Sequence, residues 1–118
     1  MKINWCEVNV YLATSPIDMR KEIDGLSTLV ADTLHQSPQS ASVYVFYNRQ
    51  KDKVKCLWWD KNGFVLYYKR LERGRFKIPT QLPDSTLLLT GEQLSWLLAG
   101  LDFYLMNQFP ELDFTHYF

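Results

Sequence analysis

Residues 42–72 read SVYVFYNRQKDKVKCLWWDKNGFVLYYKRLE, and this stretch decides the fold. Its first seven residues are a continuous β-branched and aromatic run, which is typical of a strand covered on both faces. Residues 53–60 and 64–72 follow as two further strand-like segments. They are joined at Asn62-Gly63, a dipeptide that favours a type I′ hairpin turn because both central residues need a positive φ. The stretch therefore predicts consecutive antiparallel strands.

The flanking segments add further strands and two helices. Residues 7–13 alternate between apolar and polar side chains, as a half-buried strand does, and residues 75–79 and 86–89 predict two more short strands. One helix is expected after Asp18, a candidate N-cap, and the other after Thr90, which begins a capping box. The first helix has apolar residues at helical spacing, namely Met19, Ile23, Leu26, Val30 and Leu34.

These elements predict an α+β fold in which an antiparallel β-meander of about four to five strands packs with two helices, in the order β-α-β-β-β-β-α. The length of 118 residues fits a single domain. We expect this domain to span residues 1–103 and an acidic, aromatic C-terminal tail to span residues 104–118. Because no apolar run approaches the ~18 residues of a membrane span and no signal peptide is evident, we expect a cytoplasmic protein without membrane contact.

Positive charge is concentrated in the middle of the chain, although the net charge is zero. Residues 49–77 hold ten Lys or Arg and three Asp or Glu, a balance of +7, whereas residues 1–48 have −2 and residues 78–118 have −5. Like charges in one segment repel one another, so the segment is favourable mainly where an anionic partner binds. The plainer interpretation is a solvated sheet face whose cations keep the protein soluble and protect its edge.

The predicted turns bring some of these cations together. A hairpin centred on Asn62-Gly63 places Lys55 opposite Arg70, and the following turn places Arg70 opposite Lys77. Like charges opposite each other destabilise a sheet, so such a row favours an anionic ligand. A sheet face that mixes cations with aromatic rings can contact phosphates and stack bases, which makes nucleic acid the predicted ligand.

The chain lacks the GxSxG, HExxH and glycine-rich phosphate-loop motifs of common catalytic sites. Its two cysteines, Cys6 and Cys56, are expected to be reduced thiols, and together with two histidines they are too few for a structural zinc site. Three carboxylates, Asp18, Glu22 and Asp24, are expected to complement a helix N-terminus, the alternative being the Mg²⁺ site of a nuclease. We therefore expect a protein that is not an enzyme and has no catalytic residues, no cofactor and no metal.

Three groups of residues resemble a known protein family. The first lies within residues 10–26, and the third within residues 89–102. The second is the most specific and comprises residues 43–49, 55–60, 63–64 and 68–76, together with Pro79. Over about residues 8–103 the chain resembles the accessory proteins of bacterial insertion sequence sixty-six elements, the TnpB or Orf two family.

The resemblance implies a small protein, encoded beside a transposase, that assists movement of the element, and it offers no catalytic residues to carry over to this chain. Together with the charge pattern, it predicts a non-enzymatic accessory protein that binds DNA, at element ends or at transposition intermediates, through a basic β-sheet face. The predicted nucleic-acid-binding residues are Arg20, Lys21, Lys55, Lys69, Arg70, Arg73, Arg75 and Lys77.

The alternative is a protein-interaction module that docks on the partner transposase, or on a sister accessory protein, without contacting DNA. Acidic segments with hydrophobic anchors fit basic protein surfaces. The residues that would dock are those of the acidic C-terminal end: Phe109, Glu111, Asp113, Phe114, Tyr117 and Phe118.

Overall fold

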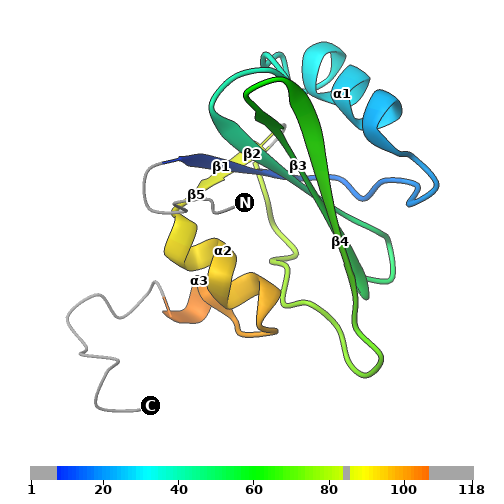
Figure 1. Ribbon diagram of the computed structural model, residues 1–118. Coiled ribbons are helices and arrows are strands. Elements are labelled where there is room, and N and C mark those ends of the chain that lie inside the picture. Colours follow the sequence, from blue (N-terminus) through cyan, green and yellow to red (C-terminus); the bar gives the residue numbers. More distant parts are fainter. Residues whose placement is uncertain (1–7, 84–85, 107–118) are drawn as a thin grey trace.

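The computed structural model describes residues 8–83 and 86–106, and these residues form one five-stranded sheet and three helices (Figure 1). Among them, no helix is long and apolar enough to cross a membrane. The α+β class and the order of the elements are confirmed, with one short helix added at the end. The elements are β1 (Asn9–Ala13), α1 (Ile23–Asp32), β2 (Ser42–Tyr47), β3 (Lys53–Asp60), β4 (Gly63–Arg70), β5 (Thr86–Leu89), α2 (Gly91–Leu98) and α3 (Phe103–Met106).

The sheet is mixed, with strand order β4-β3-β2-β1-β5. The antiparallel meander is confirmed for β2, β3 and β4, and β5 also runs antiparallel to its neighbour β1. Of the strands in the described residues, only β1 and β2 are parallel. A parallel pair needs a long crossover connection, and the segment that contains α1 supplies it. This crossover places β1 beside β2 and leaves β4 and β5 as the two edges.

Both faces of the sheet are covered, so the molecule has three layers (Figure 1). On one face, α1 packs Leu26 and Val30 against Tyr44, Phe46 and Leu57. The opposite face is covered by α2, α3 and part of the chain that follows β4, with a buried cluster that includes Val45, Cys56, Phe76, Leu94, Leu97 and Phe103. Every residue of β2 is buried, as its uninterrupted apolar and aromatic pattern predicts.

The β3–β4 hairpin forms, but its turn lies one residue earlier than expected. Asp60 pairs with Gly63, so the two central residues are Lys61 and Asn62. Only Lys61 has a positive φ, of 53°, whereas a type I′ turn needs a positive φ at both central positions. The expected Asn62-Gly63 turn is therefore wrong.

The earlier turn shifts the pairing of the two strands by two residues. It places Trp59 opposite Phe64, and their rings meet edge to face with centroids 5.0 Å apart. A shift of two residues leaves each side chain on its expected face, because side chains alternate along a strand. It changes the partners, however: Lys55 lies opposite Tyr68, and the expected row of Lys55, Arg70 and Lys77 is wrong.

The strand expected at residues 75–79 is also wrong. The chain bends at residues 72–74, where Gly74 has a φ of +77°, but no ladder follows the bend. The backbone N–H of Phe76 instead donates to the carbonyl of Lys51, at 2.7 Å, in the turn between β2 and β3. This bond carries the segment across the end of the sheet, where Phe76 and Ile78 are buried in the core.

The capping box of α2 gives a test of the fold. Thr90 Oγ1 accepts from the Gln93 N–H at 3.0 Å, and Gln93 Oε1 accepts from the Thr90 N–H at 2.9 Å. We expect Thr90→Ala to lower the free energy of unfolding, measured in urea, by about 1 kcal/mol because the cap is removed. The control Thr80→Ala changes an exposed loop residue and is expected to have an effect below about 0.5 kcal/mol. Equal effects of the two changes would contradict the cap.

Candidate nucleic-acid interface

Seven cations lie where the turn between β2 and β3 meets the chain leaving β4. Two backbone bonds join these segments: Leu71 N–H to the Asp52 carbonyl at 2.8 Å, and Phe76 N–H to the Lys51 carbonyl at 2.7 Å. Only two carboxylates, those of Asp52 and Glu72, belong to the same segments. We call this region the basic end, and its cations are Arg49, Lys51, Lys53, Arg70, Arg73, Arg75 and Lys77.

The first half of the basic end is held by Asn48, which is buried just after β2. Asn48 Oδ1 accepts from the backbone N–H groups of Asp52 and Lys53, at 3.1 and 3.0 Å, and its Nδ2 donates to Asp52 Oδ1 at 2.6 Å. The bond from Asn48 is the main reason why the pKa of Asp52 lies below its usual value. One amide side chain thus fixes the turn from which Arg49, Lys51 and Lys53 project.

The second half of the basic end is the chain that follows β4, where buried apolar residues alternate with exposed cations. Phe76 and Ile78 point into the core and are almost fully buried. In contrast, Arg75, before Phe76, and Lys77, between the two, are exposed. Lys51 also connects this chain to the turn after β2, because its ammonium donates a hydrogen bond to the Ile78 carbonyl at 3.3 Å. The apolar anchors therefore keep the neighbouring cations on the surface.

The cations of the basic end are largely free of carboxylate partners. Arg70 pairs with Glu72 at 2.8 Å, and Lys53 lies 3.4 Å from Asp52. Within residues 8–83 and 86–106, no ion pair forms at the four other exposed cations of this end, which are Arg49, Arg73, Arg75 and Lys77. Lys77 lies at the margin, where it lines a pocket with Asp102 and Tyr104.

Lys55, predicted to contact DNA, is instead buried, with 3% of its surface exposed. Its ammonium donates to the carbonyls of Met19 and Lys21, both at 2.8 Å, and to Glu22 Oε1 at 3.1 Å. It also lies 5.4 Å from the centre of the Tyr68 ring. These contacts satisfy a buried cation internally, so the Lys55 ammonium fastens the chain before α1 onto the sheet.

Lys69 also has an internal partner. It lies on the opposite face of β4, and its ammonium donates to the carbonyl of Leu98 at 2.7 Å, at the end of α2. A cation at a helix C-terminus satisfies an unpaired carbonyl and complements the helix dipole. Lys69, the one charged residue on the predicted core face, thus fastens α2 to β4.

Arg20 and Lys21 lie on the segment that Lys55 holds. The guanidinium of Arg20 bonds both carboxylate oxygens of Asp18, the shortest contact being 2.6 Å, and this hydrogen bonding lowers the pKa of Asp18 to about 2. Asp18 therefore binds Arg20 rather than capping α1, whose N-cap is Glu22. Lys21 is exposed, and its aliphatic stem lies close to Gly25 of α1.

The structure thus gathers half of the predicted site residues and separates the rest. Arg70, Arg73, Arg75 and Lys77 share the basic end. Arg20 and Lys21 belong to the segment before α1, while Lys55 and Lys69 are occupied inside the fold. The predicted site residues do not include Arg49, Lys51 and Lys53. The +7 balance of residues 49–77 already includes them, and their position between the strand-like runs 42–48 and 53–60, where the chain must turn, is the signal that could identify them.

The three carboxylates considered for a nuclease do not form a metal site. Two of these carboxylates are paired with cations: Asp18 binds Arg20, and Glu22 contacts Lys55. Over the described parts of the chain, no three His, Cys, Asp or Glu side chains are grouped closely enough to hold a metal ion. Cys56 is a free, fully buried thiol, and burial raises its pKa to about 12.

Lys55→Met tests whether this lysine is structural. We expect the free energy of unfolding, measured in urea, to fall by about 1–3 kcal/mol because two carbonyls are deprived of a charged donor. Lys53→Met, on the same face of the same strand, is the matched control; its contact with Asp52 is partly exposed, so we expect a change below about 0.5 kcal/mol. A destabilisation no greater for Lys55→Met than for Lys53→Met would refute the structural role.

Asp18 supplies a pH prediction. Its pKa lies at about 2 in the fold against 3.8 for a free carboxyl, so the ion pair stabilises the fold above the higher value and is lost as the pH falls through the lower one. We expect an NMR titration of the Asp18 carboxyl carbon to show a midpoint at about 2. In Arg20→Ala the midpoint should return towards 3.8, and an unchanged midpoint would contradict the pairing.

Comparisons with known proteins agree with the resemblance seen in the sequence. A family model described as "IS66 Orf2 like protein" matches residues 8–108. Two uncharacterised proteins of Sinorhizobium fredii (strain NBRC 101917 / NGR234) are similar to the chain. Protein y4jC is 34% identical over 103 residues, which cover 87% of each chain, and protein y4hO is 36% identical over 95 residues, which cover 80% of this chain and 82% of its own. No solved structure matches. The chain belongs to the IS66 Orf2-like protein family, a family of transposition-associated accessory proteins.

Proposed function

We propose that the protein is a non-enzymatic accessory factor of insertion-sequence transposition that binds DNA through its basic end. The observation that carries the proposal is the collection of seven cations and two carboxylates on one end of a folded sheet. The predicted sheet face is not part of the proposal, because α1 covers one face and α2, α3 and the chain after β4 cover the other.

The energetics of the basic end favour a polyanionic ligand. Its cations lie on two adjoining segments that carry two carboxylates, so they repel one another. Bringing phosphates to this surface removes that repulsion and releases counterions, which is the main source of sequence-independent affinity for DNA. Element ends or transposition intermediates are the DNA that a factor of this family would meet.

The predicted residues take unequal parts in the proposed contact. Arg73 and Arg75 are exposed and unpaired with carboxylates among the described residues, so we assign them the principal phosphate contacts. Arg70 is exposed but already forms an ion pair with Glu72, and Arg20 forms one with Asp18, so both arginines contribute less to DNA binding. Lys21 and Lys77 lie at the margins. Lys55 and Lys69 support the surface without contacting DNA.

The double variant Arg73→Ala/Arg75→Ala tests the proposal. We expect it to weaken binding to labelled duplex DNA at low salt by about tenfold or more, since each guanidinium that is removed takes away an electrostatic attraction to phosphate. The slope of log K against log salt should become shallower by about 0.9 for each phosphate that is no longer neutralised. The readout is fluorescence anisotropy over a salt series.

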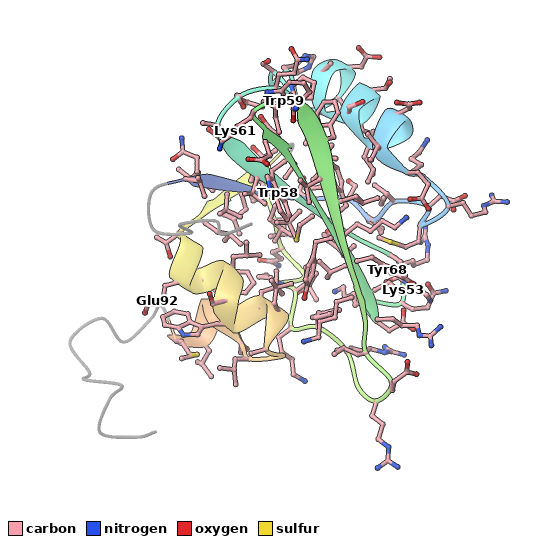
Figure 2. All side chains as sticks on the ribbon, viewed as in Figure 1. Lys53, Trp58, Trp59, Lys61, Tyr68 and Glu92 are labelled. Carbon is pink, nitrogen blue, oxygen red and sulfur yellow. The ribbon has the colours of Figure 1, made fainter. Side chains whose placement is uncertain are left out.

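Lys61→Ala is the matched control. Lys61 is an exposed cation on the β3–β4 turn, at the end of these strands opposite Lys53 (Figure 2). The substitution changes the net charge without touching the basic end, so we expect affinity for DNA to fall much less. Equal reductions in affinity per charge removed in the two proteins, or no binding by the wild-type protein at low salt, would overturn the proposal.

The alternative function, docking on the transposase or on a sister accessory protein, has one observation in its favour. Leu101, Tyr104 and Leu105 are exposed large hydrophobic residues beside the end of α2 and on α3. The aromatic and acidic residues predicted to dock, from Phe109 to Phe118, lie outside the described residues. A pull-down with the transposase of the same element, with and without residues 104–118, tests this function. The alternative function is contradicted if removal of residues 104–118 leaves the amount of transposase captured unchanged.

A further inference from the structure

β4 is an open edge of the sheet, and its register shows which backbone groups face outward. The Leu71 N–H donates to the Asp52 carbonyl at 2.8 Å, which continues the pairing of Lys53 with Arg70. In an antiparallel pair, hydrogen-bonded and non-hydrogen-bonded positions alternate. The odd-numbered residues of β4 therefore bond to β3, and the even-numbered residues turn their N–H and C=O groups to the open edge: Phe64, Leu66, Tyr68 and Arg70.

This edge carries few of the features that usually protect an exposed strand. Charged side chains, prolines, β-bulges or a short length usually prevent an edge strand from pairing with another chain. In contrast, β4 has eight residues, no proline and an unbroken register with β3. Its two cations are both at one end, and both are engaged, Lys69 by Leu98 and Arg70 by Glu72. The six residues from Gly63 to Tyr68 carry no charge.

The side chains beside this edge are apolar or aromatic. Tyr67 and Tyr68 are 36% and 50% exposed and project from opposite faces of the strand. Phe64, Val65 and Leu66 are partly buried. An uncharged edge with exposed rings on both sides suits another strand better than it suits a phosphate backbone, which the adjacent basic end would bind.

We propose that β4 pairs antiparallel with β4 of a second copy of this chain, joining two sheets into one continuous sheet. A pairing centred on Leu66 places Leu66 opposite its own equivalent and Phe64 opposite Tyr68 of the other copy. The contact is self-complementary, as a two-fold dimer requires. This inference does not depend on DNA binding.

Charge selects this orientation over a parallel one. In the antiparallel arrangement the two Arg70 residues are offset by eight positions, roughly 27 Å at the usual rise per residue. That separation exceeds the Debye length of about 8–10 Å in physiological salt, so the two basic ends do not repel strongly. A parallel pairing would place the basic ends side by side. The dimer would then present one basic end at each extremity of its joined strands.

The mass of the wild-type protein in solution is the first test. We expect sedimentation equilibrium without DNA to show a concentration-dependent shift from the 14.0 kDa monomer to twice that mass. A monomer at every concentration up to the millimolar range would overturn the proposal. Because no DNA is present, this outcome is independent of whether the basic end binds DNA.

Two variants of Tyr68 separate the contribution of its backbone N–H to dimerisation from that of its side chain. Tyr68→Pro removes an outward N–H without removing a bond to β3, and Tyr68→Ala removes the same side chain but keeps that N–H. We expect Tyr68→Pro to raise the dimer dissociation constant by about tenfold or more relative to Tyr68→Ala, while the circular dichroism spectra of the two remain alike. Equal dissociation constants would contradict strand pairing.

Amide hydrogen exchange gives a test that needs no variant. The N–H groups of Leu66 and Tyr68 should exchange quickly in dilute protein and become protected as the concentration rises, because only the second copy bonds them. The Leu71 N–H, which is bonded to Asp52 within the chain, is the internal control and should be protected throughout. A dimer that leaves the amides of Leu66 and Tyr68 unprotected would place the interface elsewhere and refute the proposal.

Discussion

The constraint on which the rest of the structure depends is the burial of β2 on both of its faces. All six of its residues are buried, so each face must be covered by another layer. α1 supplies one layer, and α2, α3 and the chain after β4 supply the other. Once both faces are closed, a charged residue of the central strands has two options: it reaches an end or an edge of the sheet, or it is satisfied inside the protein.

Lys55 and Lys69 show the second option. An unpaired ammonium inside a protein is strongly unfavourable, so a lysine is kept there only when acceptors surround it. Lys55 has three acceptors from the segment before α1, and Lys69 has the last carbonyl of α2. Lys55 fastens the chain before α1 and Lys69 fastens α2, on opposite faces of the sheet, and acceptors within the fold bind both ammonium groups.

Apart from Lys61 on the β3–β4 turn, the other cations of the central segment follow the first option and gather at one end. Asn48 fixes the turn that carries three of them, and the burial of Phe76 and Ile78 fixes the chain that carries three more. Neither anchor is itself charged. The concentration of positive charge is therefore built on a framework that would hold its shape without an anion, which distinguishes a preformed surface from a flexible basic arm.

The sequence by itself determined most of the elements, because they depend on local patterns: the apolar run of β2 and the Thr90 capping box are both present, whereas the expected strand at residues 75–79 is not. It also determined the family and the +7 segment. Tertiary structure decided the register of the hairpin, since pairing Trp59 with Phe64 outweighed the preference of Asn62-Gly63 for its own turn. It decided as well that Lys55 is buried, because the acceptors of this lysine are 33 to 36 residues away in the chain and no local sequence pattern identifies them.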